Sequence, residues 1–286
     1  MTIALQANPP TSRDTHHPQL TQRIEEASLN AWPALHQILL DGWVLRFARG
    51  FTKRSNSIVP LYATSWTETA YTSPAATRRL LAEKIRYCEN LYAREQLQTV
   101  FRISSFDNIS QSVELNARFD AAKAILDELL AERGYRREET SLVLSKTLDK
   151  KPDQNSIKLL PLDQWLLIYS QLTGLPEPAK SLHALILKSI SGDCGFAVLE
   201  KNGQTVACGM AVIEQELVGL FDIFTHPDAR GAGHGTAIVN GLCDWAANAQ
   251  AKRVYLQVVE HNETALALYQ QLGMREVYRY WYRVGP

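Results

Sequence analysis

The sequence has no excess of charge of either sign. It carries 30 Lys and Arg residues against 30 Asp and Glu residues, so its formal net charge is zero. Proteins that bind nucleic acid through phosphates have a basic excess or a basic stripe, and proteins that bind anionic membrane surfaces have a polybasic segment. The balanced charge therefore argues against nucleic acid and against a membrane surface as the main partner.

Cysteine pairs, long apolar runs and a secretion signal are also missing. The four cysteines form no Cys-x-x-Cys pair, so neither a disulfide framework nor a zinc site is expected. No stretch reaches the roughly 18 consecutive apolar residues that a membrane span needs. The first 20 residues lack a basic segment followed by an apolar one, and they predict a mobile tail. We expect a soluble, cytoplasmic protein without a bound metal.

The length and the distribution of polar residues predict two domains. The chain has 286 residues, of which 45% are hydrophobic, so two sizeable cores are possible. The clearest shift in composition is the polar, proline-containing segment 149–156, which lies between two apolar segments. Such a segment is typical of a domain linker. We predict a tail over 1–20, a first domain over 21–150 and a second over 156–286.

Strands and helices alternate in both halves. In the first half, strands are expected at 42–48, 57–61, 97–103 and 141–148, and helices at 74–93 and 121–132. In the second half, strands are expected at 195–200, 205–214, 218–225, 253–259 and 277–284, and helices at 161–172, 181–190, 235–248 and 263–272. A two-residue turn, Asn202-Gly203, joins the first two of these strands into a hairpin. This order predicts an α/β fold with mixed sheets flanked by helices.

The two halves also repeat one local order of elements. In the first half, a strand that ends at Phe106-Asp107-Asn108 precedes a helix that closes at Gly134. In the second half, a strand that ends at Glu260-His261-Asn262 precedes a helix that closes at Gly273. The repetition indicates a degenerate internal duplication, but helix, glycine and strand in succession are also a common unit without duplication.

The most informative segment is a glycine loop between a strand and a helix. The strand that ends at Thr225 is followed by a turn with Pro227, and then by Arg230-Gly231-Ala232-Gly233-His234-Gly235-Thr236. Glycines allow the backbone N–H groups to approach a ligand closely, and the helix N-terminus adds unpaired N–H groups and a positive dipole end. Arg230 adds a charge-assisted contact. Together these groups predict a site for a phosphate or pyrophosphate.

Two common nucleotide-binding patterns do not match this loop. A P-loop needs Gly-x-x-x-x-Gly-Lys-Ser/Thr, and no lysine is present here. A dinucleotide fingerprint needs Gly-x-Gly-x-x-Gly directly after the strand, whereas here the spacing is Gly-x-Gly-x-Gly and five residues, 226–230, come first.

A different family pattern does match. Arg-x-x-Gly-x-Gly after a strand and a proline turn resembles motif A of the GNAT-type N-acetyltransferase superfamily, which binds acetyl-coenzyme A. The resemblance continues through the strand 253–259, Asn262, the helix with Tyr269, and Leu272-Gly273-Met274-Arg275, which look like motif B. It covers about 130 residues, from about 156 to the C-terminus. The first half has no comparable loop over 63–73, so the resemblance implies a tandem arrangement with a degenerate N-terminal GNAT-like domain.

The resemblance implies a role for each residue of the motifs. In this family the strand before the loop splays from its neighbour, so the backbone of Ile223, Phe224 and Thr225 is expected to bind pantetheine and the thioester carbonyl. The pyrophosphate is expected on the loop and on the first turn of the following helix, at Arg230, Gly231, Ala232, Gly233, His234, Gly235 and Thr236.

Three further residues keep two interpretations each. Tyr269 is either the acid that protonates the leaving thiolate or a core tyrosine. Asn262 either bonds the cofactor or only caps the helix. Asp222, on the motif A strand, is either the general base or a residue that organises structure or substrate. The spacing of His226, His234 and His261 suits no metal motif.

The predicted function is acetyl transfer from acetyl-coenzyme A directly to the primary amine of a small molecule, by a monomer or homodimer. The acceptor is expected in the cleft between the two halves. The alternatives are acetylation of a protein lysine or N-terminus, and a protein that senses acyl-coenzyme A without catalysis.

Overall fold

The computed structural model describes residues 18–68, 73–105, 113–149 and 157–286. Residues 1–17 of the predicted tail, 150–156 of the predicted linker and the expected strand end at Phe106-Asp107-Asn108 lie outside the described residues. In the first half the elements are α1 Pro18–Ala31, β1 His36–Leu40, β2 Trp43–Phe47, η1 Lys53–Ser55, β3 Ile58–Pro60, α2 Ser65–Glu68, α3 Pro74–Arg94, β4 Val100–Ser104, α4 Val113–Glu132 and β5 Arg136–Thr147.

The second half has the same general order. Its elements are β6 Lys158–Leu159, α5 Leu162–Thr173, α6 Glu177–Lys188, β7 Asp193–Lys201, β8 Gln204–Glu214, β9 Leu217–Thr225, η2 Pro227–Ala229, α7 His234–Asn248, β10 Arg253–Val259, α8 Glu263–Gln271 and β11 Arg275–Val284. The predicted α/β class, with a mixed, mostly antiparallel sheet flanked by helices, is confirmed. Asn202 and Gly203 both have positive φ, as the predicted two-residue hairpin turn requires.

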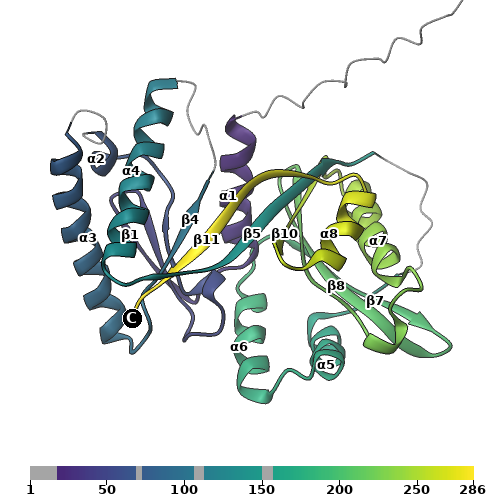
Figure 1. Cartoon of the computed structure of the whole chain (residues 1–286). Helices are drawn as coiled ribbons and strands as arrows, with labels where there is room; N and C mark the ends of the chain where they lie inside the picture. The colour runs from purple at the N-terminus through teal and green to yellow at the C-terminus, as the bar shows by residue number, and fades with distance from the viewer. Residues whose placement is uncertain (1–17, 69–72, 106–112, 150–156) are drawn as a thin grey trace, which may run out of the picture.

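All described strands form one sheet. Its order is β1-β2-β3-β4-β11-β5-β10-β9-β8-β7-β6, with parallel pairs only at β3–β4 and β9–β10 among the described strands. β11, the last strand, lies between β4 and β5 of the first half, and β5 lies between β11 and β10 of the second. Figure 1 shows these two long strands crossing the middle of the molecule. The two halves therefore exchange a strand, and the domain boundaries 21–150 and 156–286 stay a prediction.

The exchange is symmetric in the order of elements. β4, α4 and β5 follow one another in the first half as β10, α8 and β11 do in the second. If β4 is matched with β10 and β5 with β11, the central order β4-β11-β5-β10 is the same from either end. Both helices end in the same hydrogen-bonded turn at a glycine of positive φ. The Tyr135 N–H donates to the Leu130 carbonyl, and the Met274 N–H donates to the Tyr269 carbonyl. This correspondence is the structural counterpart of the repeated order in the sequence.

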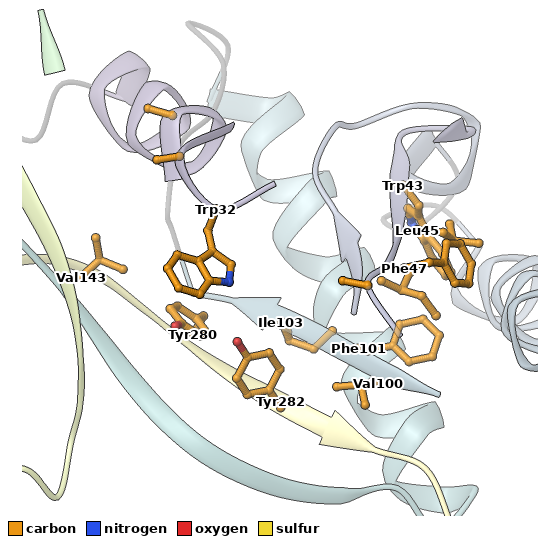
Figure 2. Packing of buried hydrophobic residues seen from close by; sticks show 14 of the residues in the cluster. Trp32, Trp43, Leu45, Phe47, Val100, Phe101, Ile103, Val143, Tyr280 and Tyr282 are labelled. Carbon is orange, nitrogen blue, oxygen red and sulfur yellow. The ribbon is translucent and has the colours of Figure 1, made fainter. Parts of the chain in front are cut away.

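Helices cover both faces of the sheet. α7 and α8 enclose one apolar core against β8, β9 and β10. α5 and α6 cover the opposite face of the second half, and α1 crosses from the first half to contact β8 and β9 there. Figure 2 shows Trp32, just after α1, above Tyr280 and Tyr282 of β11 and beside β4. The first half thus supplies part of the cover of the second half.

Helix α1 was missed by the sequence analysis, which placed its first residues, 18–20, in the tail. The physical reason is that part of the surface that α1 buries is polar, so few large apolar residues mark the helix in the sequence. Thr21, Glu25 and Ser28 are all 3% exposed or less. Glu25 pairs with Arg102 of β4 at 2.8 Å, and both side chains are fully buried. The Tyr278 hydroxyl of β11 also donates to Glu25. The ion pair and this hydrogen bond together connect α1 to strands from both halves.

The position in the first half that corresponds to the glycine loop is filled with aromatic residues. α2 follows β3 as the loop follows β9, and its Trp66 is completely buried. The Trp66 ring makes edge contacts with Trp43 of β2 and Phe119 of α4. The structure of this segment therefore agrees with the absence of a glycine loop from the first half.

Glu25→Ala is expected to lower the free energy of unfolding by about 3–5 kcal/mol, because it leaves the guanidinium of Arg102 buried without its carboxylate. Urea unfolding followed by circular dichroism measures the change. Arg23→Ala, on the same helix, is the control, since Arg23 contacts Glu216 only at the surface and the expected loss is below about 0.5 kcal/mol. Equal losses for the two variants would contradict a structural role for the buried pair.

Candidate active site

Strand β9 leaves its neighbour β10 at the place where the motif begins. The parallel ladder joins Arg253–Leu256 of β10 to Leu217–Leu220 of β9 and stops there. β10 continues to Val259 with partners on β5 alone. On the other side of β9, the register with β8 shifts between Cys208 and Met210, which oppose Phe224 and Phe221. This bulge bends β9, so the sheet opens between β9 and β10.

Asp222 occupies the bulge. Its φ of 52° lies in the left-handed region, which aspartate tolerates better than most residues. The next three residues, Ile223, Phe224 and Thr225, are half-buried and alternate between the two faces of the sheet, with Ile223 against the α7 core and Phe224 against the opposite one. The predicted splay of this strand is therefore present in the backbone, beside the residues expected to bind pantetheine.

The glycine loop is open and ordered. η2 follows β9, and the Arg230 Nε–H donates to the Thr225 carbonyl at 3.4 Å, so the exposed arginine side chain lies back along the strand end. Gly231 and Gly233 have φ of 79° and 78°, and a Cβ on either would meet nothing within 4 Å. The glycines therefore serve backbone conformation and leave the space above the loop free.

Helix α7 begins directly after this loop. Gly233 is its N-cap and provides no side-chain cap. The first bond from the loop region runs from the Ala237 N–H to the Gly233 carbonyl. By helix geometry, the N–H groups of His234, Gly235 and Thr236 have no acceptor within the helix. These N–H groups and the positive end of the helix dipole lie where the sequence predicts a site for an anion.

A cavity of about 910 Å³ begins at this helix start. Gly233 and Thr236 line one end of it, and it continues along α7 to the turn at Leu272 and Gly273 and the end of β5. The predicted cofactor residues Gly233 and Thr236 therefore line the same cavity as Gly273, the glycine that follows α8, on the α7–α8 side of the sheet.

Asp222 lies on the opposite face of the sheet, among groups that the sequence analysis missed. His183 Nε2 of α6 is 2.9 Å from one Asp222 oxygen, without the alignment of a hydrogen bond. The Tyr169 hydroxyl of α5 donates to the other oxygen at 3.4 Å. Burial, followed by the Asp222 charge, raises the pKa of Tyr169 strongly, so this phenol stays protonated. The Asp222 side chain is 14% exposed and the His183 side chain 2%.

The imidazole of His183 is enclosed by rings from both halves. Trp32 and Phe51 of the first half lie 5.3 and 5.5 Å from it, and Tyr169 and Trp165 of the second half lie 5.4 and 6.4 Å away. The only signal in the sequence was a histidine on the apolar face of the expected helix 181–190. A histidine at such a position is also found as an ordinary core residue. The contacts of His183 with other elements could therefore be identified only from the fold.

Tyr269 and Asn262 hold positions in α8. Asn262 is the N-cap, and its side chain accepts from the Ala265 N–H at 3.2 Å, so the capping interpretation is present in the structure. Tyr269 is 8% exposed and lies in the core formed with α7. Burial raises the pKa of Tyr269 to about 12. A phenol with this pKa is protonated at neutral pH and is able to give up a proton, but not to take one.

The site residues therefore fall into two groups. The loop, the start of α7 and Tyr269 lie on the α7–α8 side, and Asp222 lies on the α1–α5–α6 side. The opening between β9 and β10 separates them. Among the described residues, no helix is long and apolar enough to cross a membrane.

Known proteins match this arrangement over nearly the whole chain. The family model described as "Probable histone acetyltransferase Rv0428c C-terminal" matches residues 21–283. The chain belongs to this family. It is 27% identical over 272 residues to "Uncharacterized N-acetyltransferase YobR" from Bacillus subtilis (strain 168), with 92% of this chain and 98% of YobR covered.

Solved structures share the fold at low identity. A GCN5-related N-acetyltransferase from Kribbella flavida matches with a TM-score of 0.60 and 14% identity, covering 93% of this chain and 95% of that one. One from Sphaerobacter thermophilus matches with a TM-score of 0.54 and 17% identity, covering 72% and 69%. Family and fold together identify a GNAT-type acetyltransferase, an acyltransferase in which two GNAT-like halves are arranged in tandem and the first lacks the loop.

The Tyr269 hydroxyl is expected to contribute little to folding, because it makes no hydrogen bond with another described residue. Tyr269→Phe should change the free energy of unfolding by less than about 0.5 kcal/mol. Tyr278→Phe is the comparison, since it removes the hydroxyl that donates to buried Glu25, and it should cost about 1–3 kcal/mol. Both values come from urea unfolding. A loss at Tyr269 as large as that at Tyr278 would make Tyr269 a core tyrosine with a structural hydroxyl.

Proposed function

We propose that this acetyltransferase moves an acetyl group from acetyl-coenzyme A directly to the primary amine of a small molecule. The observation that carries the proposal is the opening between β9 and β10 beside a helix that begins in a glycine loop. This opening gives access to the β9 backbone from one face of the sheet, and to Asp222 from the other.

Acetyl-coenzyme A fits the groups on the α7–α8 side. The N–H groups of His234, Gly235 and Thr236, the exposed loop Gly231-Ala232-Gly233 and Arg230 provide donors and one positive charge for a pyrophosphate. The cavity that starts at Gly233 provides further space along α7. When bound, acetyl-coenzyme A supplies the activated acetyl thioester. Because most donors are backbone amides, the neutral net charge of the chain is compatible with a phosphate-bearing ligand.

Strand β9 is placed to handle the thioester carbonyl. Beyond Leu220 its β10-side edge has no ladder partner, so the backbone groups of the segment Ile223, Phe224 and Thr225 that do not pair with β8 are available at the opening. An N–H group aimed at a carbonyl oxygen stabilises the negative charge that develops there during acyl transfer. We assign this function to the backbone of these three residues.

Asp222 is assigned as the group that accepts a proton from the amine. It is the carboxylate at the bulge, and it is partly exposed on the face opposite the cofactor groups. His183 and Tyr169 lie against its two oxygens from neighbouring helices, and Tyr169 donates a hydrogen bond to one of them. Tyr269, which is protonated at neutral pH, is assigned as the acid that gives a proton to the departing thiolate.

The acceptor is expected to be small. The face around Asp222 is enclosed by α5, α6 and the Trp32 region of the first half, and every side chain named there is at most half-exposed. A site built from both halves fits the domain-interface position that small-molecule pockets favour.

Turnover of the full chain with a panel of small amines tests the proposal. Thiol release is followed in time and the acetylated product is identified by mass spectrometry, with hydrolysis without amine subtracted. Acetylation of small amines is expected. Turnover on a histone, on other protein lysines or on a protein N-terminus, with none on small amines, would favour the alternative that the family name suggests. Cofactor binding without turnover on any acceptor would favour an acyl-coenzyme A sensor.

Arg230→Glu should weaken binding of acetyl-coenzyme A by about 10- to 100-fold, because a charge-assisted contact is replaced by repulsion. Isothermal titration calorimetry measures the affinity, and an unchanged circular dichroism spectrum checks the fold. Lys201→Glu makes the same charge change at the exposed end of β7 and should leave the affinity unaltered. Equal affinity for the Arg230 variant and the unmodified chain would remove the pyrophosphate assignment.

Tyr269→Phe should lower kcat by at least about 10-fold while changing cofactor affinity little, since it removes the proton donor and keeps the ring. Steady-state kinetics and calorimetry measure the two quantities separately. Tyr87→Phe, at an exposed position on α3, is the matched control. If kcat of the Tyr269 variant equals that of the control, Tyr269 is not the acid.

A further inference from the structure

Two neighbouring cations on η1 have different surroundings. Lys53 Nζ lies 2.9 Å from Glu138 and 2.6 Å from Glu139, both at the start of β5. The side chain of Arg54 makes neither an ion pair nor a hydrogen bond with another described residue. Its Nε is fully enclosed and has no partner among the residues that the structure describes, although the residue as a whole is only partly buried. A guanidinium so placed has lost part of its hydration without gaining an acceptor.

The loop that carries Arg54 is fixed by its own sequence. The Asn56 side chain accepts from the N–H groups of Ala48 and Gly50 at 2.7 and 2.9 Å, and donates to the Thr52 carbonyl at 2.7 Å. The Trp32 indole N–H donates to the Thr52 hydroxyl at 3.1 Å. This hydrogen-bond network therefore fixes the loop that carries Arg54, and the Arg54 guanidinium takes no part in it.

Arg54 lies on the same face as Asp222. Its guanidinium is 5.2 Å from the Trp32 ring centre and 5.6 Å from that of Phe221, the residue before Asp222 on β9. Both charges act on the Tyr169 phenol. Beyond the effect of burial, Asp222 raises the pKa of Tyr169 and Arg54 lowers it. A carboxylate from one half and a guanidinium from the other thus both lie near one hydroxyl.

We propose that Arg54 binds a carboxylate of the acceptor, so that the acceptor is an amino-acid-like molecule with both an amine and a carboxylate. This inference rests on the proposed function. The amine is directed to Asp222 and the carboxylate to Arg54, whose planar fork matches a carboxylate with two parallel hydrogen bonds. The flanking rings of Trp32 and Phe221 hold the guanidinium through cation–π contacts, while its two terminal nitrogens, unlike the enclosed Nε, stay available.

The test compares each of several amino acids with its carboxamide, which keeps the shape and the amine but has no negative charge. The unmodified chain is expected to have a higher kcat/KM for the acid. Arg54→Met keeps an apolar stem on the rings, and it should lower the ratio of kcat/KM for acid over amide by about 10- to 100-fold, mostly through KM. Lys53→Met, the neighbouring cation, should change this ratio by less than about twofold.

Other results would overturn the proposal. A preference of the unmodified chain for the amide, or an equal loss of kcat/KM for both acceptors in Arg54→Met, would make Arg54 a structural residue. If phosphoethanolamine is a better acceptor than every amino acid tested, the acceptor group that Arg54 binds is a phosphate and not a carboxylate.

Binding of amino acids separates a failure of this proposal from a failure of the proposed acetyl transfer. If no amine is acetylated, the amino acids are titrated into the full chain and the rise in melting temperature is recorded. Stabilisation by amino acids but not by their amides, lost in Arg54→Met, would support the carboxylate site without the proposed reaction. No stabilisation of the unmodified chain by any amino acid would overturn it.

Discussion

The antiparallel ladder between β5 and β11 is the interaction on which the rest of the structure depends. Each of these strands pairs on its other edge with a strand of the opposite half, so neither half has a complete sheet alone. The buried pair of Glu25 and Arg102, with the Tyr278 hydroxyl, fixes α1 over this ladder. A buried pair of charges tolerates few alternative arrangements, because any shift leaves a charge unpaired. Topology and electrostatics therefore impose the same alignment on the two halves.

The exchange also explains how the sheet is able to open at the site. The outer part of β10, from Gln257 to Val259, keeps its ladder with β5 and needs nothing from β9. β9 bends away at Asp222 while it remains held by β8. The loss of backbone hydrogen bonds at the opening is thus confined to one edge of each strand. Meanwhile α1 and η1 reach across from the first half, so the face around Asp222 is built jointly.

The sequence predicted the features that depend on local chemistry. The glycine loop, the hairpin at Asn202-Gly203 and the helix that closes at Gly273 are each specified by a few adjacent residues. It did not predict the strand exchange, because pairing of β11 with β4 depends on residues far apart in the chain. It missed α1, whose buried face is partly polar. Tyr169, His183 and Arg54 were also missed, since each looks ordinary in its own segment and acquires meaning only from partners on other elements.

The position of β11 in chain order has a consequence for how the protein is made. Of the described strands, β11 is synthesised last, yet it fills the gap between β4 and β5, which are made much earlier. Until it arrives, those two strands expose unpaired edges, which are templates for pairing with other chains. Domains usually fold in turn during translation. Here the first half cannot complete its sheet before the second half is made. The risk of aggregation is therefore greatest between the synthesis of β5 and that of β11, and a chaperone or rapid translation would lower it most in this interval.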